Sequence, residues 1–120
     1  MARPRNFDEA TVIGQAAGVF GRLGFNGSSV DDLLAATSLQ RGSLYKAFGS
    51  KRNLFEKVLD AALQPGWAQN ALALDLLIIA LKELAADDDA IKAICRRALA
   101  ESGADPAGLL GRRLLDYLEK

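Results

Sequence analysis

Residues 28–48 read SSVDDLLAATSLQRGSLYKAF, and two short helical patterns lie within them. The first pattern begins at a hydroxyl side chain, Ser28 or Ser29, that can accept a hydrogen bond from the first turn of a helix. Acidic residues follow at once, as the positive end of a helix dipole favours. With Leu33 and its apolar neighbours on one side, the pattern predicts a short helix that ends near Thr37.

A second short helix is expected after a tight connection through Ser38 and Leu39. It covers residues 40–48, and Leu44 and Phe48 form its apolar side. A helix this short is not stable alone in water, so it must pack on other elements. Its other side stays polar and consists of Gln40, Arg41, Ser43 and Lys46.

Helical patterns also lie on both sides of this pair. Upstream, apolar residues recur at helical spacing over residues 8–23, and the segment 24–27 supplies the glycines that end a helix. Downstream, Ser50 can cap a fourth helix, which residues 64–66 end. Two short helices joined by a turn and braced by a third form the arrangement that presents a recognition helix to the major groove of DNA.

The remaining residues continue the helical pattern. We expect an apolar helix from Trp67 to about Ala85, a break at residues 87–89, a further helix, and a turn over 102–106 before a final helix. No alternating pattern typical of strands occurs, so the predicted fold is all-α. We divide the chain into a helix-turn-helix head (residues 1–52), a connecting helix and turn (53–66) and a short helical body for dimerisation and regulation (67–120).

Composition narrows the class of protein further. Half of the 120 residues are hydrophobic and a quarter are charged, which is enough apolar material for a core. One cysteine and no histidine exclude an internal disulfide and give no support to a metal site. The chain begins without a secretory signal, and its longest apolar run, residues 71–81, is too short to cross a bilayer. We therefore expect a cytoplasmic protein with no membrane partner.

The charges are unevenly distributed, although 15 basic and 15 acidic residues balance. The head carries seven basic and four acidic side chains, a net charge of +3, so the rest of the chain carries −3. A basic part joined to an acidic part favours a DNA-binding head on a body that does not bind DNA. The basic residues of the head are Arg3, Arg5, Arg22, Arg41, Lys46, Lys51 and Arg52, and its acidic residues are Asp8, Glu9, Asp31 and Asp32.

The polar side of the second short helix matches the chemistry of base recognition. Arg41 can bond guanine through two hydrogen bonds, and Gln40 can bond adenine in the same way. Gly42 would let the helix backbone approach the DNA closely. The alternative is a solvated surface without a ligand. The side chains able to reach phosphates are Ser43, Tyr45 and Lys46.

These residues stand in an order that resembles the tetracycline-repressor (TetR) family of transcriptional regulators. The resemblance covers roughly residues 8–60 and implies a repressor that binds palindromic, double-stranded operator DNA as a homodimer. It is carried by Phe20, Gly24, Phe25, Ser28, Ser29, Asp32, Leu33, the run Arg41-Gly42-Ser43-Leu44-Tyr45, Phe48, Ser50-Lys51 and Leu54-Phe55.

The resemblance also implies a role for each residue of the candidate DNA-binding site. Ser28 and Ser29, at the start of the second helix, would touch a phosphate. Lys51 would add a phosphate contact at the N-terminus of the fourth helix, where exposed amides already favour an anion. Gln40, Arg41, Gly42 and Ser43 would face bases, and Tyr45 and Lys46 would hold the DNA backbone.

Two positions depart from the family pattern. Ser38 stands where a glycine commonly makes the turn, and Gln40 stands where a small capping serine is common. Because serine adopts left-handed backbone less readily than glycine, we expect a turn of slightly different shape.

Residues 67–120 follow the connecting turn, where the family usually has five or six helices around a ligand pocket. The resemblance implies a small-molecule effector, but this body does not favour a full ligand cavity.

A homodimer is expected through the last two helices, residues 88–101 and 106–118. Four such helices from two chains could close a bundle that neither chain completes alone. The alternative function is a helical protein-interaction module that has lost DNA binding, which the neutral overall charge favours and the polar side of residues 40–48 disfavours. The apolar stripes of the two helices expected to form the dimer are Ile91, Ile94, Cys95 and Ala98 on residues 88–101, and Leu110, Leu114, Tyr117 and Leu118 on residues 106–118.

Other chemistry-bearing residues have simpler interpretations. Residues 87–89 fit a helix cap better than a metal site, since no other ligand clusters with them. Cys95 is better interpreted as a small core residue than as a reactive thiol. Trp67 is better interpreted as a packing residue than as a residue that contacts a ligand. Tyr45 could equally be a half-buried aromatic residue. No carboxylate pair, Ser/His/Asp set or glycine-rich phosphate loop occurs, so we expect no enzyme activity and no cofactor.

Overall fold

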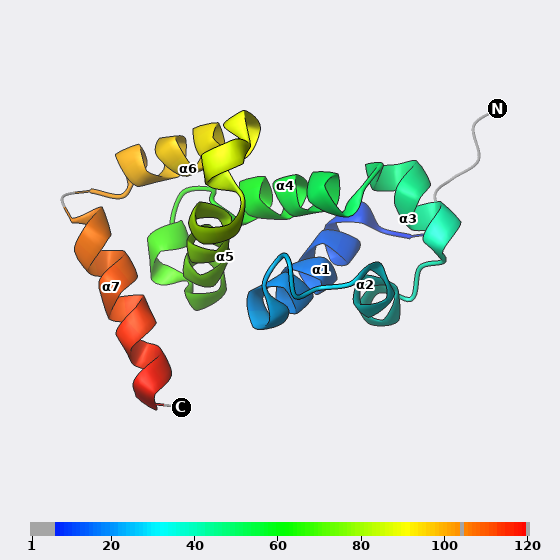
Figure 1. Ribbon diagram of the computed structural model, residues 1–120, viewed down its shortest axis with the longest axis horizontal. Helices are drawn as coiled ribbons and strands as arrows, with labels where there is room; N and C mark the ends of the chain where they lie inside the picture. The colour runs from blue at the N-terminus through cyan, green and yellow to red at the C-terminus, as the bar shows by residue number, and fades with distance from the viewer. Residues whose placement is uncertain (1–6, 104, 120) are drawn as a thin grey trace.

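A computed structural model describes residues 7–103 and 105–119. Within these ranges the chain forms seven α-helices and three short 3₁₀ turns and no strand, which confirms the predicted all-α fold (Figure 1). None of these helices is long and apolar enough to span a membrane. The helices are α1 (Glu9–Leu23), α2 (Val30–Thr37), α3 (Arg41–Phe48), α4 (Lys51–Ala62), α5 (Ala71–Glu83), α6 (Asp89–Glu101) and α7 (Pro106–Asp116), and the 3₁₀ turns are η1 (Trp67–Gln69), η2 (Ala85–Asp87) and η3 (Tyr117–Glu119).

Side-chain caps define where most of these helices begin. Asp8, Ser50 and Asp105 each accept a hydrogen bond from a backbone N–H in the first turn of the helix that follows. Asp88 does the same for α6, which confirms that residues 87–89 contain a helix cap. Arg3 and Arg5, counted above in the charge of the head, and Ala104, in the predicted turn before the last helix, lie outside the described residues.

The predicted apolar helix from Trp67 to Ala85 was wrong at its start. Trp67 lies in η1, after Gly66 at a φ of 93°, and its side chain is only 4% exposed. The α-helix begins at Ala71, because the Asn70 side chain accepts a hydrogen bond from the Ala73 N–H and caps it. Trp67 is therefore a core residue at the entry to α5, as its packing interpretation predicts.

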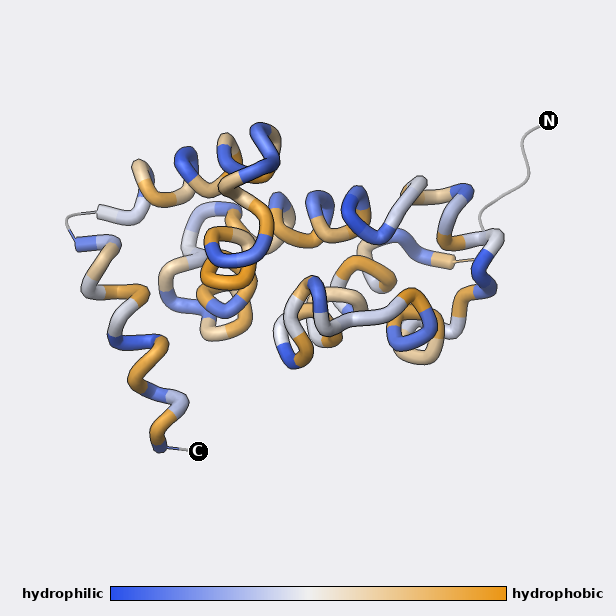
Figure 2. Tube along the Cα trace, viewed as in Figure 1, coloured by the Kyte–Doolittle hydropathy of each residue, from blue (hydrophilic) through white to orange (hydrophobic). Residues whose placement is uncertain are grey.

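A single apolar core runs along the molecule. Phe20 of α1, Phe55 of α4 and Phe25 of the α1–α2 loop form a cluster with ring centroids 5.1 to 6.0 Å apart. Helix α4 packs on α1 and on α5, and α6 covers α5 and α4. The apolar residues of these helices therefore face one another inside (Figure 2). The helix-turn-helix pair α2–α3 lies at one end of the long axis of the molecule and α7 lies at the other (Figure 1). The molecule measures 50 × 31 × 26 Å.

The last two helices use their apolar residues differently. The stripe of α6 is already buried within the same chain, since Ile91, Cys95 and Ala98 are each no more than 2% exposed. It is therefore not free to form a bundle with a second chain, contrary to the expectation above. Helix α7 buries no residue fully: its Leu114 and Leu115 are 51% and 64% exposed, and Leu118 of the following η3 is 78% exposed.

An ion pair holds α7 to the rest of the molecule. The Arg113 guanidinium donates two hydrogen bonds, of 2.8 and 2.9 Å, to the carboxylate of Asp75 on α5. The Tyr117 hydroxyl also donates to Asp75, and the Arg113 guanidinium lies 4.9 Å from the centre of the Tyr117 ring. Both members of the pair are largely buried, at 13% and 12% exposed. These contacts fix the direction in which α7 leaves the core.

Candidate DNA-binding site

Helix α2 begins with a reciprocal cap. The Ser29 hydroxyl accepts a hydrogen bond from the Asp32 N–H, and the Asp32 carboxylate accepts one from the Ser29 N–H, both at 2.9 Å. The hydrogen bond from the Ser29 backbone is the main reason that the pKa of Asp32 is lowered. Of the two hydroxyls that sequence reasoning offered as the cap, Ser29 is the one used.

The turn between α2 and α3 runs through a left-handed serine. Ser38 has φ 60° and ψ 17°, a conformation that glycine adopts at less cost. Thr37 supports the turn, because its buried hydroxyl donates to the Leu33 carbonyl and accepts from the Leu39 N–H. The chain thus makes the turn without glycine, and the left-handed backbone is located at Ser38.

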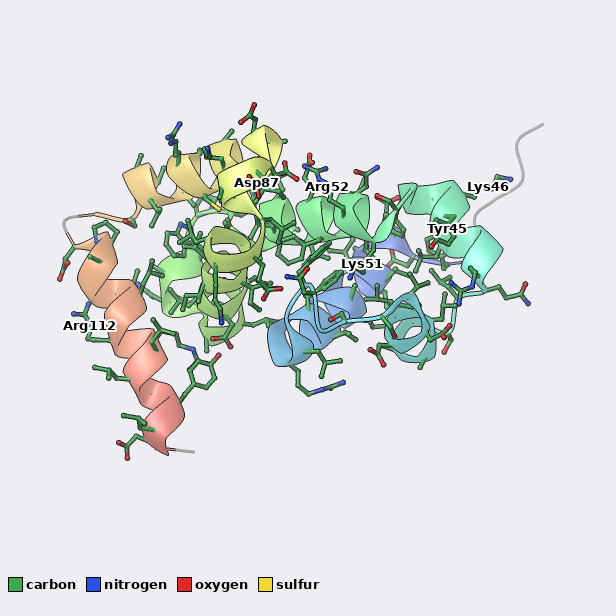
Figure 3. The ribbon with its side chains drawn as sticks, viewed as in Figure 1. Tyr45, Lys46, Lys51, Arg52, Asp87 and Arg112 are labelled. Atoms are coloured by element: carbon green, nitrogen blue, oxygen red, sulfur yellow. The ribbon has the colours of Figure 1, made fainter. Side chains whose placement is uncertain are left out.

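Helix α3 buries one side and leaves the other in solvent. Leu44 and Phe48 are in the core, as predicted, and Gln40 precedes the helix without a side-chain capping bond. A Cβ placed on Gly42 would meet no atom of the chain within 4 Å, so the space beside this glycine is open. Figure 3 shows Tyr45 and Lys46 on this helix at one end of the molecule. The exposed residues of the segment are Gln40, Arg41, Gly42, Ser43, Tyr45 and Lys46.

Arg41 has an acidic partner in the structure. Its guanidinium donates to the carboxylate of Asp31 in the first turn of α2, and both side chains are more than half exposed. A pair this exposed contributes at most about 1 kcal/mol, so a DNA base or phosphate can compete for the arginine. Sequence reasoning missed this partner, because two positions ten apart in different helices leave no signal for a contact.

Ser28 and Lys51 lie together at the loop between α1 and α2. Ser28 is 2% exposed, and its hydroxyl donates to the Gly24 carbonyl. The Lys51 ammonium donates to the carbonyls of Phe25 and Ser28, both at 2.9 Å, and lies 4.3 Å from the centre of the Phe25 ring. Figure 3 shows Lys51 at the start of α4, beside this loop. The α1–α2 loop is thus held by two residues that the resemblance assigned to phosphates.

The arrangement of α2, the turn and α3 matches a known family. The family model described as "Bacterial regulatory proteins, tetR family" matches residues 12–58, which run from the first turn of α1 into α4. Residues 12–58 thus form a TetR-type N-terminal region. All of α2 and α3 lies inside this matched region.

Two curated relatives support the same assignment. The chain is 38% identical over 77 residues to the uncharacterized HTH-type transcriptional regulator YezE of Bacillus subtilis, and 36% identical over 58 residues to the HTH-type transcriptional repressor ComR of Escherichia coli. These alignments cover 64% and 48% of the chain, but only 38% and 28% of the relatives. No solved structure matches it at a significant level.

Proposed function

We propose that the chain is a transcriptional regulator that binds double-stranded operator DNA through α2 and α3. The observation that carries the proposal is the exposed side of α3, where Arg41, Ser43 and Lys46 surround a glycine with open space beside it. Leu44 and Phe48 are buried in the core, and this packing holds the polar side of the helix in a fixed position. Arginine and lysine at such positions supply base readout and phosphate attraction.

The proposal includes a homodimer on a palindromic site. One short recognition helix contacts too few base pairs to be selective, whereas two related by a two-fold axis reach successive major grooves about 34 to 36 Å apart. The exposed leucines of α7 offer the surface for a second chain. Repression is the expected direction, supported by the Escherichia coli relative, which is named as a transcriptional repressor. The alignment covers only 28% of that protein, so repression by this chain is a proposal.

An effector belongs to the proposal as well. A hollow of about 380 Å³ lies beside η1, between residues 65–69 and the end of α6 at Glu101 and Ser102. It is open to solvent, which fits a small polar ligand better than a large apolar one. A metabolite that raises the melting temperature and changes DNA affinity would support this part. If no metabolite in a thermal-shift screen changes DNA affinity, regulation by an effector is contradicted.

Selection from randomised duplex DNA tests the function directly. We expect a palindromic site to be enriched, and Arg41→Ala to weaken binding to it by about 1 to 3 kcal/mol while relaxing the preference at one base pair. Lys46→Ala is the matched control for a phosphate contact and should weaken all duplexes alike. If the wild-type chain enriches no sequence and binds no duplex, the proposal is wrong, and a helical protein-interaction module becomes the better description.

A further inference from the structure

The loop that enters α2 is held from two sides. Residues 24–29, called here the entry loop, end at Ser29, the cap of α2. From one side Lys51 of α4 binds the carbonyls of Phe25 and Ser28. From the other side the carboxylate of Glu83, the last residue of α5, accepts a hydrogen bond of 2.7 Å from the Asn26 N–H. The second contact joins residues 57 positions apart.

Glu83 also fits closely against the start of the entry loop. Gly24 has φ 80°, and a Cβ placed there would lie 2.9 Å from the second carboxylate oxygen of Glu83. The carboxylate therefore occupies the space beside Gly24 while it binds Asn26. A hydrogen bond to a charged acceptor is stronger than a neutral one, so this contact restrains the loop more than an ordinary turn contact does.

We propose that Glu83 is a positioning residue for DNA binding. It fixes the entry loop against α5 and thereby sets the direction of α2, whose position in turn supports α3. The proposal rests on the proposed function, because the quantity that Glu83 controls is the presentation of α2 and α3 to DNA. Through Glu83, helix α5 directly contacts the entry loop that leads into α2.

The test compares three single variants of the whole chain. Glu83→Ala removes the acceptor, Glu83→Gln keeps an acceptor oxygen, and Asp87→Ala removes an exposed carboxylate in η2 as a control. We expect Glu83→Ala to lower affinity for the selected duplex about fivefold and to speed hydrogen exchange at the Asn26 amide by a similar factor, as the loss of one hydrogen bond implies. Glu83→Gln should stay within about twofold of the wild type in both measurements, and Asp87→Ala should match the wild type.

Two outcomes overturn the proposal. In the first, Glu83→Ala binds DNA and exchanges at Asn26 as the wild type does. In the second, Glu83→Ala loses DNA affinity while the Asn26 amide exchanges as in the wild type, which would mean that Glu83 does not act by holding the entry loop. A wild-type chain that binds no duplex refutes the proposed function instead. The exchange rates at Asn26 and along α2, which need no DNA, then still decide whether Glu83 positions this helix.

Discussion

Gly42 is a helical glycine that no contact within the chain requires. A methyl group at this position would meet no protein atom within 4 Å, and glycine is among the poorest helix formers. The residue therefore weakens α3 without improving the packing of the core. A close approach of DNA to the helix backbone gives it a physical reason.

Gly42→Ala should separate stability from DNA binding. We expect the free energy of unfolding to rise by about 0.5 to 1 kcal/mol, because alanine favours the helix, and the affinity for operator DNA to fall, because the methyl group occupies the approach. Denaturant unfolding and gel shifts measure the two quantities. Gly18→Ala on α1, where a Cβ also meets nothing within 4 Å, is the control and should raise stability without changing DNA affinity. Equal DNA binding by both variants would remove the role assigned to Gly42.

Single residues also mark where sequence reasoning succeeded and where it could not. A hydroxyl cap at Ser28 or Ser29, an unusual turn at Ser38 and the burial of Leu44 follow from local rules of helix ends and spacing, although these rules do not tell which serine is the cap. The carbonyls that Lys51 binds lie 23 and 26 residues away. A contact between distant segments leaves no periodic signal in the sequence, so this role of Lys51 could only be seen in the structure.

At the scale of elements, α4 connects the two ends of the molecule. Arg52, in its first turn, donates two hydrogen bonds of 2.7 Å to Asp88, the cap of α6, and also binds Glu56 one turn on (Figure 3). The arginine is the main reason that the pKa of Asp88 falls from 3.8 to about 2. Helix α6 is therefore tied by its first residues to the helix that follows the recognition helix.

Asp88→Asn should be less stable than the wild type in a pH-dependent way. The amide still caps α6, so the change isolates the ion pair. Because the pKa of Asp88 is lower in the folded than in the unfolded chain, the ion pair stabilises the fold fully above about pH 4, and this stabilisation is lost as the pH falls towards 2. Melting temperatures from pH 7 down to 2 should show the gap between the two proteins closing in that range. A gap that stays constant would mean that the charge of Asp88 does not stabilise the fold.

Sequence reasoning is also limited in how well it places the ends of helices. All seven α-helices were foreseen from spacing and caps, but the segment 67–70 was assigned to α5 because its residues are apolar enough for a helix. Asn70 was the available signal, since an asparagine followed by a long apolar helix is a typical cap. Apolar spacing alone cannot separate a 3₁₀ turn from the α-helix that it precedes.

At the scale of the whole molecule, α3, which carries the proposed DNA-binding surface, and α7 lie at opposite ends (Figure 1). The sequence predicted a dimer through two apolar stripes, but packing within the chain uses the stripe of α6. Spacing identifies an apolar side without telling whether the same chain or another covers it. Helix α7 is left as the surface on which the proposed dimer depends.

Leu114→Asp should therefore separate the two chains. Leu114 is 51% exposed, so a charge there disturbs no buried core and instead prevents a second chain from covering α7. We expect a monomer in sedimentation velocity and affinity for the palindrome reduced about a hundredfold, as loss of two-site binding implies. Leu23→Asp, on an exposed leucine at the end of α1, should remain dimeric. A wild-type chain that sediments as a monomer at micromolar concentration and binds its palindrome fully would contradict the dimer.

The position of Trp67 has a practical consequence for all of these measurements. It is the single tryptophan of the chain, and it lies buried in η1, where the chain passes from α4 to α5. Its fluorescence therefore comes from one known place, far from the surface that we propose contacts DNA. An indole shielded from water emits at shorter wavelength than one in water, so its emission should shift to the red when α5 and α6 separate from α4. The chain thus carries an intrinsic optical probe of its own interior, which needs no label.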